Sequence, residues 1–223
     1  MKIISWNCRM AASRKLDRVL KMQPDLLIVQ ECSRADIAAM DAKFSYWVGN
    51  NPNKGLGVLG FGDHSFEIDP SFRGDLTWFI PVRITDVSLN VLGLWASRTT
   101  PHDGYVRETH KALDHYQNFL STNFSVVMGD FNSNTIWDHL HRGRSHSDMV
   151  ARLGALGLAS VYHATREEEQ GQETVSTFYQ KHKGYHIDYA FASQVIAERA
   201  QLEILAAADW LGVSDHVPMV LTF

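Results

Sequence analysis

The sequence has little cysteine, no long apolar run and no excess of positive charge. Only two of its 223 residues are cysteines, Cys8 and Cys32, which excludes a disulfide framework and a structural zinc site of four cysteines. Its longest apolar stretches, such as 187–192 with Asp188 inside it, are far too short to cross a membrane. The N-terminal MKIISWNCR reaches a polar residue at Asn7, unlike a secretory signal peptide. We therefore expect a cytoplasmic protein without a membrane partner.

The charge balance is slightly acidic. The 21 lysines and arginines are outnumbered by 25 aspartates and glutamates, which gives a net charge of −4. Proteins that bind nucleic acid by charge alone usually carry a marked basic excess, so this balance argues against that class but permits a local basic cleft. A chain of 223 residues with 45% hydrophobic residues can form one large-cored domain. We expect a single domain over 1–223 and a monomer.

Segments typical of strands and of helices alternate along the chain. The strand-like segments are 3–6, 26–30, 57–60, 77–85, 89–95, 125–129, 186–192, 203–205 and 219–222. The helix-like segments are 13–22, 34–40, 106–120 and 149–156, and Ser13 is the expected N-cap of the first. This alternation predicts an α/β protein. Taken alone, it favours a single parallel sheet.

Polar residues accompany five of the strand-like segments near their ends. These residues are Asn7, Glu31, Asp130, Asn132, Asp188, Asp215 and His216. One polar strand end is commonly a turn, because Asp and Asn bond to their own backbone. Five of them supplying carboxylates, carboxamides and a histidine predict one shared site beyond the strand ends, where ligands bind in α/β sheets.

The order of the motifs resembles the endonuclease/exonuclease/phosphatase superfamily, the deoxyribonuclease I-like proteins. The motifs are SWN, QE, GDFN, HIDYAF and SDHVP, and they span essentially the whole chain. The resemblance implies a four-layer α/β sandwich, with two packed, mostly antiparallel sheets flanked by helices, in place of a single parallel sheet. It also implies an enzyme that hydrolyses phosphate esters.

Hydrolysis of a phosphodiester at neutral pH requires a metal to offset charge and a positioned water molecule. Glu31 is the best candidate for a direct metal ligand, and Asn7, Asp130, Asn132 and Asp215 are expected nearby. Oxygen donors of this kind suit a hard ion such as Mg²⁺ or Mn²⁺.

The resemblance also suggests roles for the remaining residues. It places His216 on the scissile phosphate, either as a general base or as a cationic clamp, and Asp188 as the carboxylate that orients this histidine. Asp130 would orient or deprotonate the attacking water. Asn132 and Asn7 would hold phosphate or water as neutral donors and acceptors.

Position 95 departs from the family pattern. Most members place a His or Tyr after this strand to contact the phosphate, whereas this chain has Trp95. An indole donates one hydrogen bond but cannot act as an acid or a base. Arg98, His102 or Tyr105 of the same loop could supply the missing donor, although Tyr105 is equally consistent with loop packing.

The segment after GDFN carries Trp137, Arg142 and Arg144 and should overhang the site. An aromatic ring with flanking arginines can stack on bases and pair with phosphates, although Trp137 could equally be a packed lid. The leading hypothesis is therefore a metal-dependent nuclease acting on DNA as an endonuclease, an exonuclease or both, possibly in repair.

Two alternatives remain open. A phosphatase or phosphodiesterase of a small or lipid phosphate ester agrees with the acidic charge, but the chain shows no long apolar loop for membrane docking. A catalytically dead binding protein would be expected to lack Glu31 or His216, and both are present. Within the nuclease hypothesis, an abasic-site enzyme would usually show WNxNGxR where this chain has WNCRMAAS.

Overall fold

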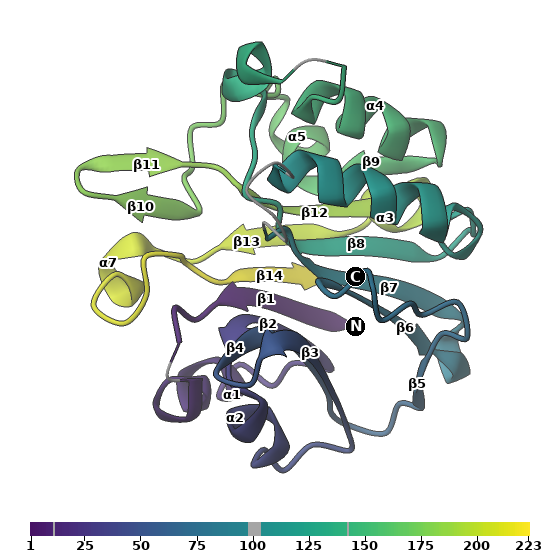
Figure 1. Ribbon diagram of the computed structural model, residues 1–223, viewed down its shortest axis with the longest axis vertical. Helices are drawn as coiled ribbons and strands as arrows, with labels where there is room; N and C mark the ends of the chain where they lie inside the picture. The colour runs from purple at the N-terminus through teal and green to yellow at the C-terminus, as the bar shows by residue number, and fades with distance from the viewer. Residues whose placement is uncertain (11, 98–103, 142) are drawn as a thin grey trace.

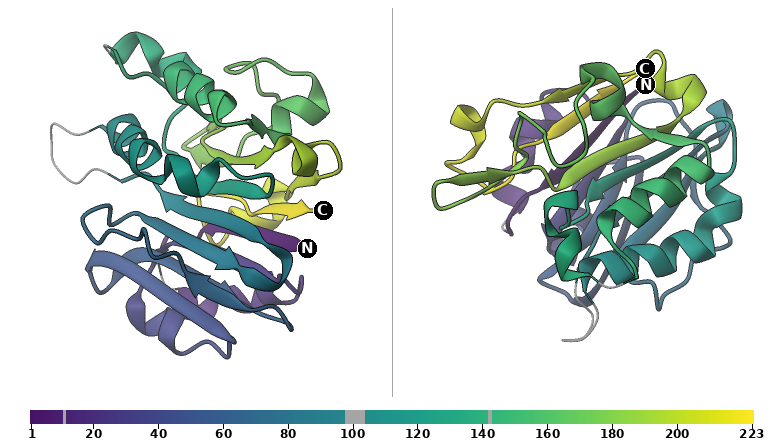
Figure 2. Two further views of the ribbon diagram at one scale, coloured as in Figure 1. Left: turned by 90° about the vertical axis from the view of Figure 1, so that its right-hand side faces the viewer. Right: turned by 90° about the horizontal axis from the view of Figure 1, so that it is seen from above.

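The computed structural model describes residues 1–10, 12–97, 104–141 and 143–223. Two six-stranded sheets pack face to face (Figure 1). Helices cover the outer face of each sheet, as the two further views in Figure 2 also show. This is the four-layer α/β sandwich that the family resemblance implied. The single parallel sheet favoured by the order of the elements alone is wrong, because the strands form two large sheets and most of their pairs are antiparallel.

The first sheet contains both ends of the chain. In spatial order its strands are β13 (Gln201–Ile204), β14 (Met219–Thr222), β1 (Lys2–Asn7), β2 (Leu26–Cys32), β4 (Lys54–Gly60) and β3 (Phe44–Asn51). Strand β1 is parallel to β2 and antiparallel to β14, so the first and last strands lie side by side (Figure 1). The outer face is covered by η1 (Ala12–Arg14), α1 (Leu16–Leu20) and α2 (Arg34–Ala38).

The second sheet carries the longest helix on its outer face. In spatial order its strands are β5 (Phe66–Ile68), β6 (Phe79–Ile84), β7 (Leu89–Trp95), β8 (Ser125–Asp130), β12 (Asp188–Ser193) and β9 (Leu158–Ser160). Only β7 and β8 are parallel among its pairs. Its helices are α3 (Tyr105–Leu120), α4 (His146–Ala155) and α5 (Val161–Arg166), which follows β9.

The remaining elements are short. They are η2 (Thr85–Val87), η3 (Thr135–Leu140), α6 (Gln194–Ala197), α7 (Ala207–Trp210) and the hairpin of β10 (Phe178–Gln180) with β11 (Lys183–Tyr185). In Figure 1 this hairpin projects well beyond the two sheets. Among the described residues, no helix is long and apolar enough to cross a membrane.

The apolar residues of the first sheet divide between two cores. Ile3 and Ile28 belong to the large core between the sheets, whereas Trp6 and Val29 belong to a second core beneath the helices. Successive side chains of a strand point to opposite faces, so a strand buried on both faces must be apolar at nearly every position. This explains the continuous apolar run in β2.

Two details of the expected elements differ in the structure. Helix α1 begins at Leu16 with Lys15 at its N-cap, so Ser13 is not the cap that the sequence predicted. Ser13 lies instead in the preceding 3-10 turn, which the hydrogen bond from Lys15 N to Ala12 O closes at 2.8 Å. The sequence pattern also did not predict β3 or the three-residue strands β5, β9, β10 and β11, of which the last four are too short to show a periodic signal.

Candidate active site

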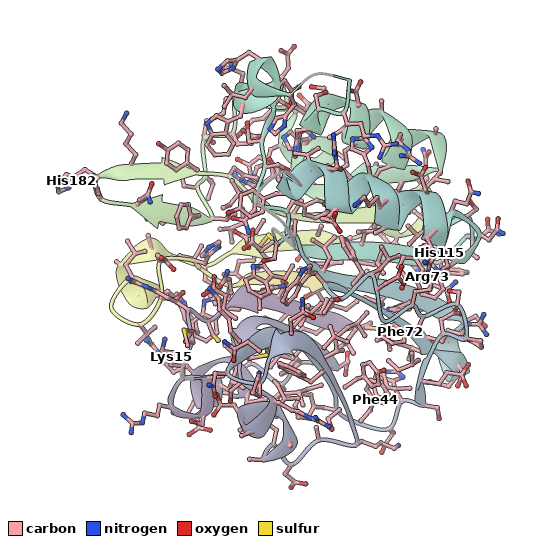
Figure 3. The ribbon with its side chains drawn as sticks, viewed as in Figure 1. Lys15, Phe44, Phe72, Arg73, His115 and His182 are labelled. Atoms are coloured by element: carbon pink, nitrogen blue, oxygen red, sulfur yellow. The ribbon has the colours of Figure 1, made fainter. Side chains whose placement is uncertain are left out.

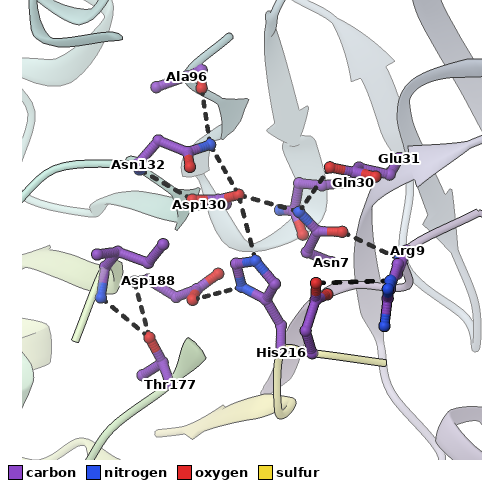
Figure 4. A network of polar contacts seen from close by, with 12 residues as sticks. Asn7, Arg9, Gln30, Glu31, Ala96, Asp130, Asn132, Thr177, Asp188 and His216 are labelled. Carbon is purple, nitrogen blue, oxygen red and sulfur yellow. Dashed lines mark hydrogen bonds and ion pairs between the residues drawn. The ribbon is translucent and has the colours of Figure 1, made fainter. Parts of the chain in front are cut away.

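The polar residues predicted from the strand ends meet where the ends of the two sheets converge (Figure 4). Register brings two carboxylates together, because Asp130 at the end of β8 pairs directly with Asp188 at the start of β12. Asp130 is fully buried and Asp188 is 3% exposed. At Gly129, just before this pair, an added Cβ would lie 2.0 Å from Leu94 O, so only glycine permits the close approach of β7 and β8.

His216 lies between the two carboxylates. Its Nδ1 is 2.9 Å from Asp188 Oδ2, and its Nε2 is 3.9 Å from Asp130 Oδ2. The loop that carries it is fixed by neighbouring contacts, since Ser214 Oγ accepts from His216 N at 3.2 Å and Trp6 Nε1 donates to His216 O at 3.1 Å. The imidazole is thus held in one orientation, with Nε2 facing the site.

These contacts change the proton affinity of both groups. Burial would lower the pKa of His216, but the charges of Asp188 and Asp130 and the hydrogen bond to Asp188 outweigh it and raise this pKa to about 9. Burial and the nearby charge of Asp188 raise the pKa of Asp130 to about 7, although His216 and hydrogen bonds from Asn7 and Asn132 lower it. Both shifts favour the protonated form, which makes His216 a cation and Asp130 a weaker acid than an exposed aspartate.

Two carboxamides surround Asp130. Asn7 Nδ2 donates to Asp130 Oδ2 at 3.0 Å and approaches Glu31 Oε1 at 3.5 Å. Asn132 Nδ2 donates to Asp130 Oδ2 at 3.0 Å and to Ala96 O at 2.9 Å, while its backbone N–H donates to Asp130 Oδ1 at 2.8 Å. Asn132 has a positive φ of 49°, which asparagine tolerates better than most residues. The two carboxamides therefore hold Oδ2 of Asp130 in place, and the backbone N–H of Asn132 holds Oδ1.

Glu31 enters the site from a β-bulge in β2. Its φ is 58°, and the pairing of β2 with β4 shifts register between Gln30 and Cys32. Lys54 Nζ on the neighbouring strand lies 3.1 Å from Glu31 Oε2. Asp215 is similarly accompanied by a cation, with Arg9 Nε 3.5 Å from its Oδ2.

The donor set fits a divalent cation. One ligand atom from each of Asp130, Asp188 and His216 lies within 4.8 Å of the others, although His216 can ligate a metal only in its neutral form. Glu31 adds a carboxylate that is 21% exposed and thus accessible to an ion. Carboxylate and carboxamide oxygens favour hard ions such as Mg²⁺ and Mn²⁺.

The residues predicted to bind substrate are spread around this centre. Trp95 pairs with Asp130 in register but is only 5% exposed, so its ring serves chiefly as packing. Tyr105 and Trp137 line cavities beside Asn132. Arg144 is exposed. Arg98, His102 and Arg142 lie outside the described residues, and their roles stay predictions.

Three contributors were not foreseen from the sequence. Gln30 Nε2 joins the sheets by donating to Ser5 Oγ at 2.9 Å and to Leu94 O at 3.1 Å. Thr177 Oγ1 accepts from the backbone N–H of Ile187 and of Asp188, each at 3.0 Å. Lys54 sits in a turn-forming stretch, NPNKG, where a lysine is ordinarily solvated. Only Gln30 carried a signal, as a polar residue ending an apolar run.

A family model described as the Endonuclease/Exonuclease/phosphatase family matches residues 4–216. No curated protein matches the sequence closely enough to give a relative.

Several solved structures share the fold. A 3′-5′ exonuclease (NExo) from Neisseria meningitidis superposes with a TM-score of 0.75 at 16% identity, covering 100% of this chain and 99% of that chain. An AP endonuclease from Archaeoglobus fulgidus superposes with a TM-score of 0.71 at 19% identity, covering 100% of this chain and 99% of that chain. The endonuclease domain of TRAS1, a telomere-specific non-LTR retrotransposon, superposes with a TM-score of 0.68 at 15% identity, covering 99% of this chain and 96% of that chain. At these identities the likenesses establish the fold.

The raised pKa of His216 predicts a pH-dependent stability. A group whose pKa is higher in the folded state stabilises the protein below its ordinary pKa, here 6.5, and loses that contribution as pH rises through about 9. In metal-free buffer the free energy of unfolding should therefore fall across this window, by on the order of 3 kcal/mol from His216. Urea unfolding at a series of pH values measures it.

His216→Gln should lose most of this decline between pH 6.5 and about 9, because glutamine has no proton to release. His139→Gln, at an exposed histidine of η3, should retain it. Equal declines in the two variants would contradict the assignment of the raised pKa to His216.

Proposed function

The chain belongs to the Endonuclease/Exonuclease/phosphatase family, and we propose that it is a divalent-metal-dependent phosphodiesterase that hydrolyses DNA. The family as a whole depends on divalent metals, and the site offers suitable donors. The structural neighbours are described as a 3′-5′ exonuclease and an AP endonuclease, and a variant of NExo, there described as a 3′ phosphatase, has also been determined with a product DNA hairpin. These descriptions support DNA as the substrate class.

One feature of the molecule favours nucleic acid over a small phosphate ester. A cavity of about 620 Å³ opens beside Asn132, and its aromatic lining consists of Tyr105, Trp137, Phe178 and Tyr185. The ring of Phe178 lies 4.7 Å from that of His216, so the cavity adjoins the site directly. Aromatic walls of this kind accept a nucleobase by stacking, which a substrate without a base would leave unused.

The β10–β11 hairpin forms one wall of this cavity and carries positive charge at its tip. Phe178 and Tyr185 stand at its base, and Lys181, His182 and Lys183 are exposed at its turn. Figure 3 shows His182 at the outermost point of the hairpin, directed away from the body of the protein. A basic projection beside a base-sized cavity suits a strand that continues past the site, because lysine pairs with backbone phosphates.

The geometry suggests how the chain's own residues act. His216 is protonated at neutral pH, so its Nε2–H can donate to a phosphoryl oxygen, and it acts as a cationic clamp rather than as a base. Asp188 holds the imidazole and sustains its charge. Asp130, with its pKa near 7, can accept a proton from the attacking water. Asn7 and Asn132 fix Asp130 and offer neutral contacts to phosphate.

Glu31 is the residue best placed to hold the metal, with Asn7 beside it and Asp130 and Asp215 contributing from the same end of the sheets. Asp188 and His216 already satisfy each other, whereas the Glu31 carboxylate is partly exposed. When bound, a divalent cation would offset the negative charge of the phosphate during hydrolysis.

Glu31→Gln tests the metal assignment. The substitution removes one full ligand charge and keeps the shape, so Mg²⁺ binding should weaken and turnover should fall by about a hundredfold or more. Mg²⁺ titration of DNA hydrolysis and calorimetry measure the two effects. Activity that persists unchanged in EDTA would refute the metal-dependent reaction.

A double-mutant cycle tests the pair of His216 and Asp188. His216→Ala and Asp188→Ala should each reduce kcat strongly, by about a hundredfold or more, and the double variant should lose little beyond the worse single one, because the two groups act as a unit. If the fold-losses of the two single variants multiply in the double variant, Asp188 serves some purpose other than holding His216.

Trp137→Ala tests the base cavity. Loss of one stacking ring should lower kcat/KM on DNA roughly 5- to 150-fold. This corresponds to a loss of about 1–3 kcal/mol of transition-state stabilisation. Hydrolysis of a small chromogenic phosphodiester should scarcely change, because that substrate does not fill the cavity. Ile136→Ala, at a 44% exposed residue of the same turn, serves as the matched control and should retain DNA hydrolysis. Equal losses on both substrates would refute base binding there.

A further inference from the structure

A second cavity, of about 320 Å³, opens on the other side of Asn132. It lies between the β3–β4 hairpin and the end of β7, and it shares Tyr105 and Asn132 with the aromatic cavity. Its wall is rich in hydrogen-bond donors, which are Asn50, Asn51, Lys54, Trp78 and Ser97. Glu31 is the one carboxylate among its lining residues in the described part of the chain. The two cavities therefore flank the site and differ in chemistry.

Trp78 lines this cavity and carries an unsatisfied donor. The residue is 6% exposed and makes an edge contact with Trp95, with ring centroids 4.8 Å apart. Its Nε1 is buried and has no hydrogen-bond partner among the residues that the structure describes. A buried donor without a partner is costly, so a group that accepts a hydrogen bond is expected in this cavity.

Lys54 gives the cavity a cation. Asn51 pairs with Lys54 across the two-residue turn at 52–53, which places the lysine at the start of β4 facing the bulged Glu31. Its Nζ lies 3.1 Å from Glu31 Oε2 and 5.2 Å from the centre of the Trp95 ring. The side chain is 38% exposed. Lys54 thus lines the cavity beside Glu31, the candidate metal ligand.

These hydrogen-bond donors suit an anionic group better than a nucleobase. The indole rings of Trp78 and Trp95 are 6% and 5% exposed, so their faces are not open for stacking. We propose that this cavity binds the phosphate group next to the scissile phosphate on the same strand, with the Lys54 ammonium and the Trp78 Nε1–H as its principal donors. The inference rests on the proposed nuclease function and extends it to a substrate that the protein binds at two consecutive phosphates.

Three nucleotides can test the contribution of the second phosphate alone. Deoxythymidine 3′,5′-bisphosphate carries two phosphates on one sugar, as a DNA strand does, and each of its monophosphates carries one. All proteins would carry Asp130→Asn, so that the probe is not hydrolysed, and binding would be measured by calorimetry with Mg²⁺. The protein should bind the bisphosphate at least about tenfold more tightly than the better monophosphate, as expected for charge-assisted hydrogen bonds.

Two substitutions locate this preference. Trp78→Phe removes the N–H but keeps a packed ring, and Lys54→Met removes the charge but keeps the length. Each should reduce the preference for the bisphosphate to below about threefold. Lys54→Arg should restore part of it. Lys43→Met removes the same charge at an exposed position before β3 and should retain the full preference.

The proposal is overturned if the parent protein shows no preference for the bisphosphate, or if Trp78→Phe and Lys54→Met both keep it. Thermal unfolding of each variant verifies that it is folded. The nuclease function fails separately, when the unmodified protein does not hydrolyse DNA, because the binding preference is measured without catalysis.

Discussion

Two buried carboxylates that face each other across neighbouring strands require a cation, and His216 supplies it. Asp130 and Asp188 are paired in register and almost fully buried. Uncompensated, two such charges would repel each other and lose their hydration. The single positive charge of the imidazolium between them attracts both carboxylates, and the carboxylates in return favour the protonated ring. Much of the surrounding structure serves to bring this histidine, carried by the other sheet, to that position.

The contacts between the sheets follow from this requirement. Trp6 and Ser214 fix the loop of His216 from the first sheet, and Asn7 reaches across to Asp130 in the second. Gln30 crosses the same boundary deeper in the core. Each is a directional bond in a buried place, where a polar group left unpaired would be costly. The site is therefore rigid before any ligand arrives, which suits catalysis by preorganised charge.

Residues at strand ends could be predicted from the sequence, whereas residues defined by their neighbours could not. Asn7, Asp130 and Asp188 interrupt apolar runs, and that local signal is enough to place them at one edge of the sandwich. Lys54 and Trp78 carry no such signal, because their significance arises only when β4 and the segment before β6 meet at one cavity. The fold class required the order of the family motifs, since the alternation of elements alone suggested a parallel sheet.

The charge on His216 is the central claim of this account, and NMR can observe it directly. The imidazole of His216 in metal-free protein, titrated by its ring signals, should show a pKa near 9, and Asp188→Asn should lower it markedly. A protonated ring at neutral pH would support the cationic clamp. A pKa at or below 6.5 would contradict the account, because a neutral His216 could neither offset the two buried carboxylates nor serve as a cationic donor to phosphate.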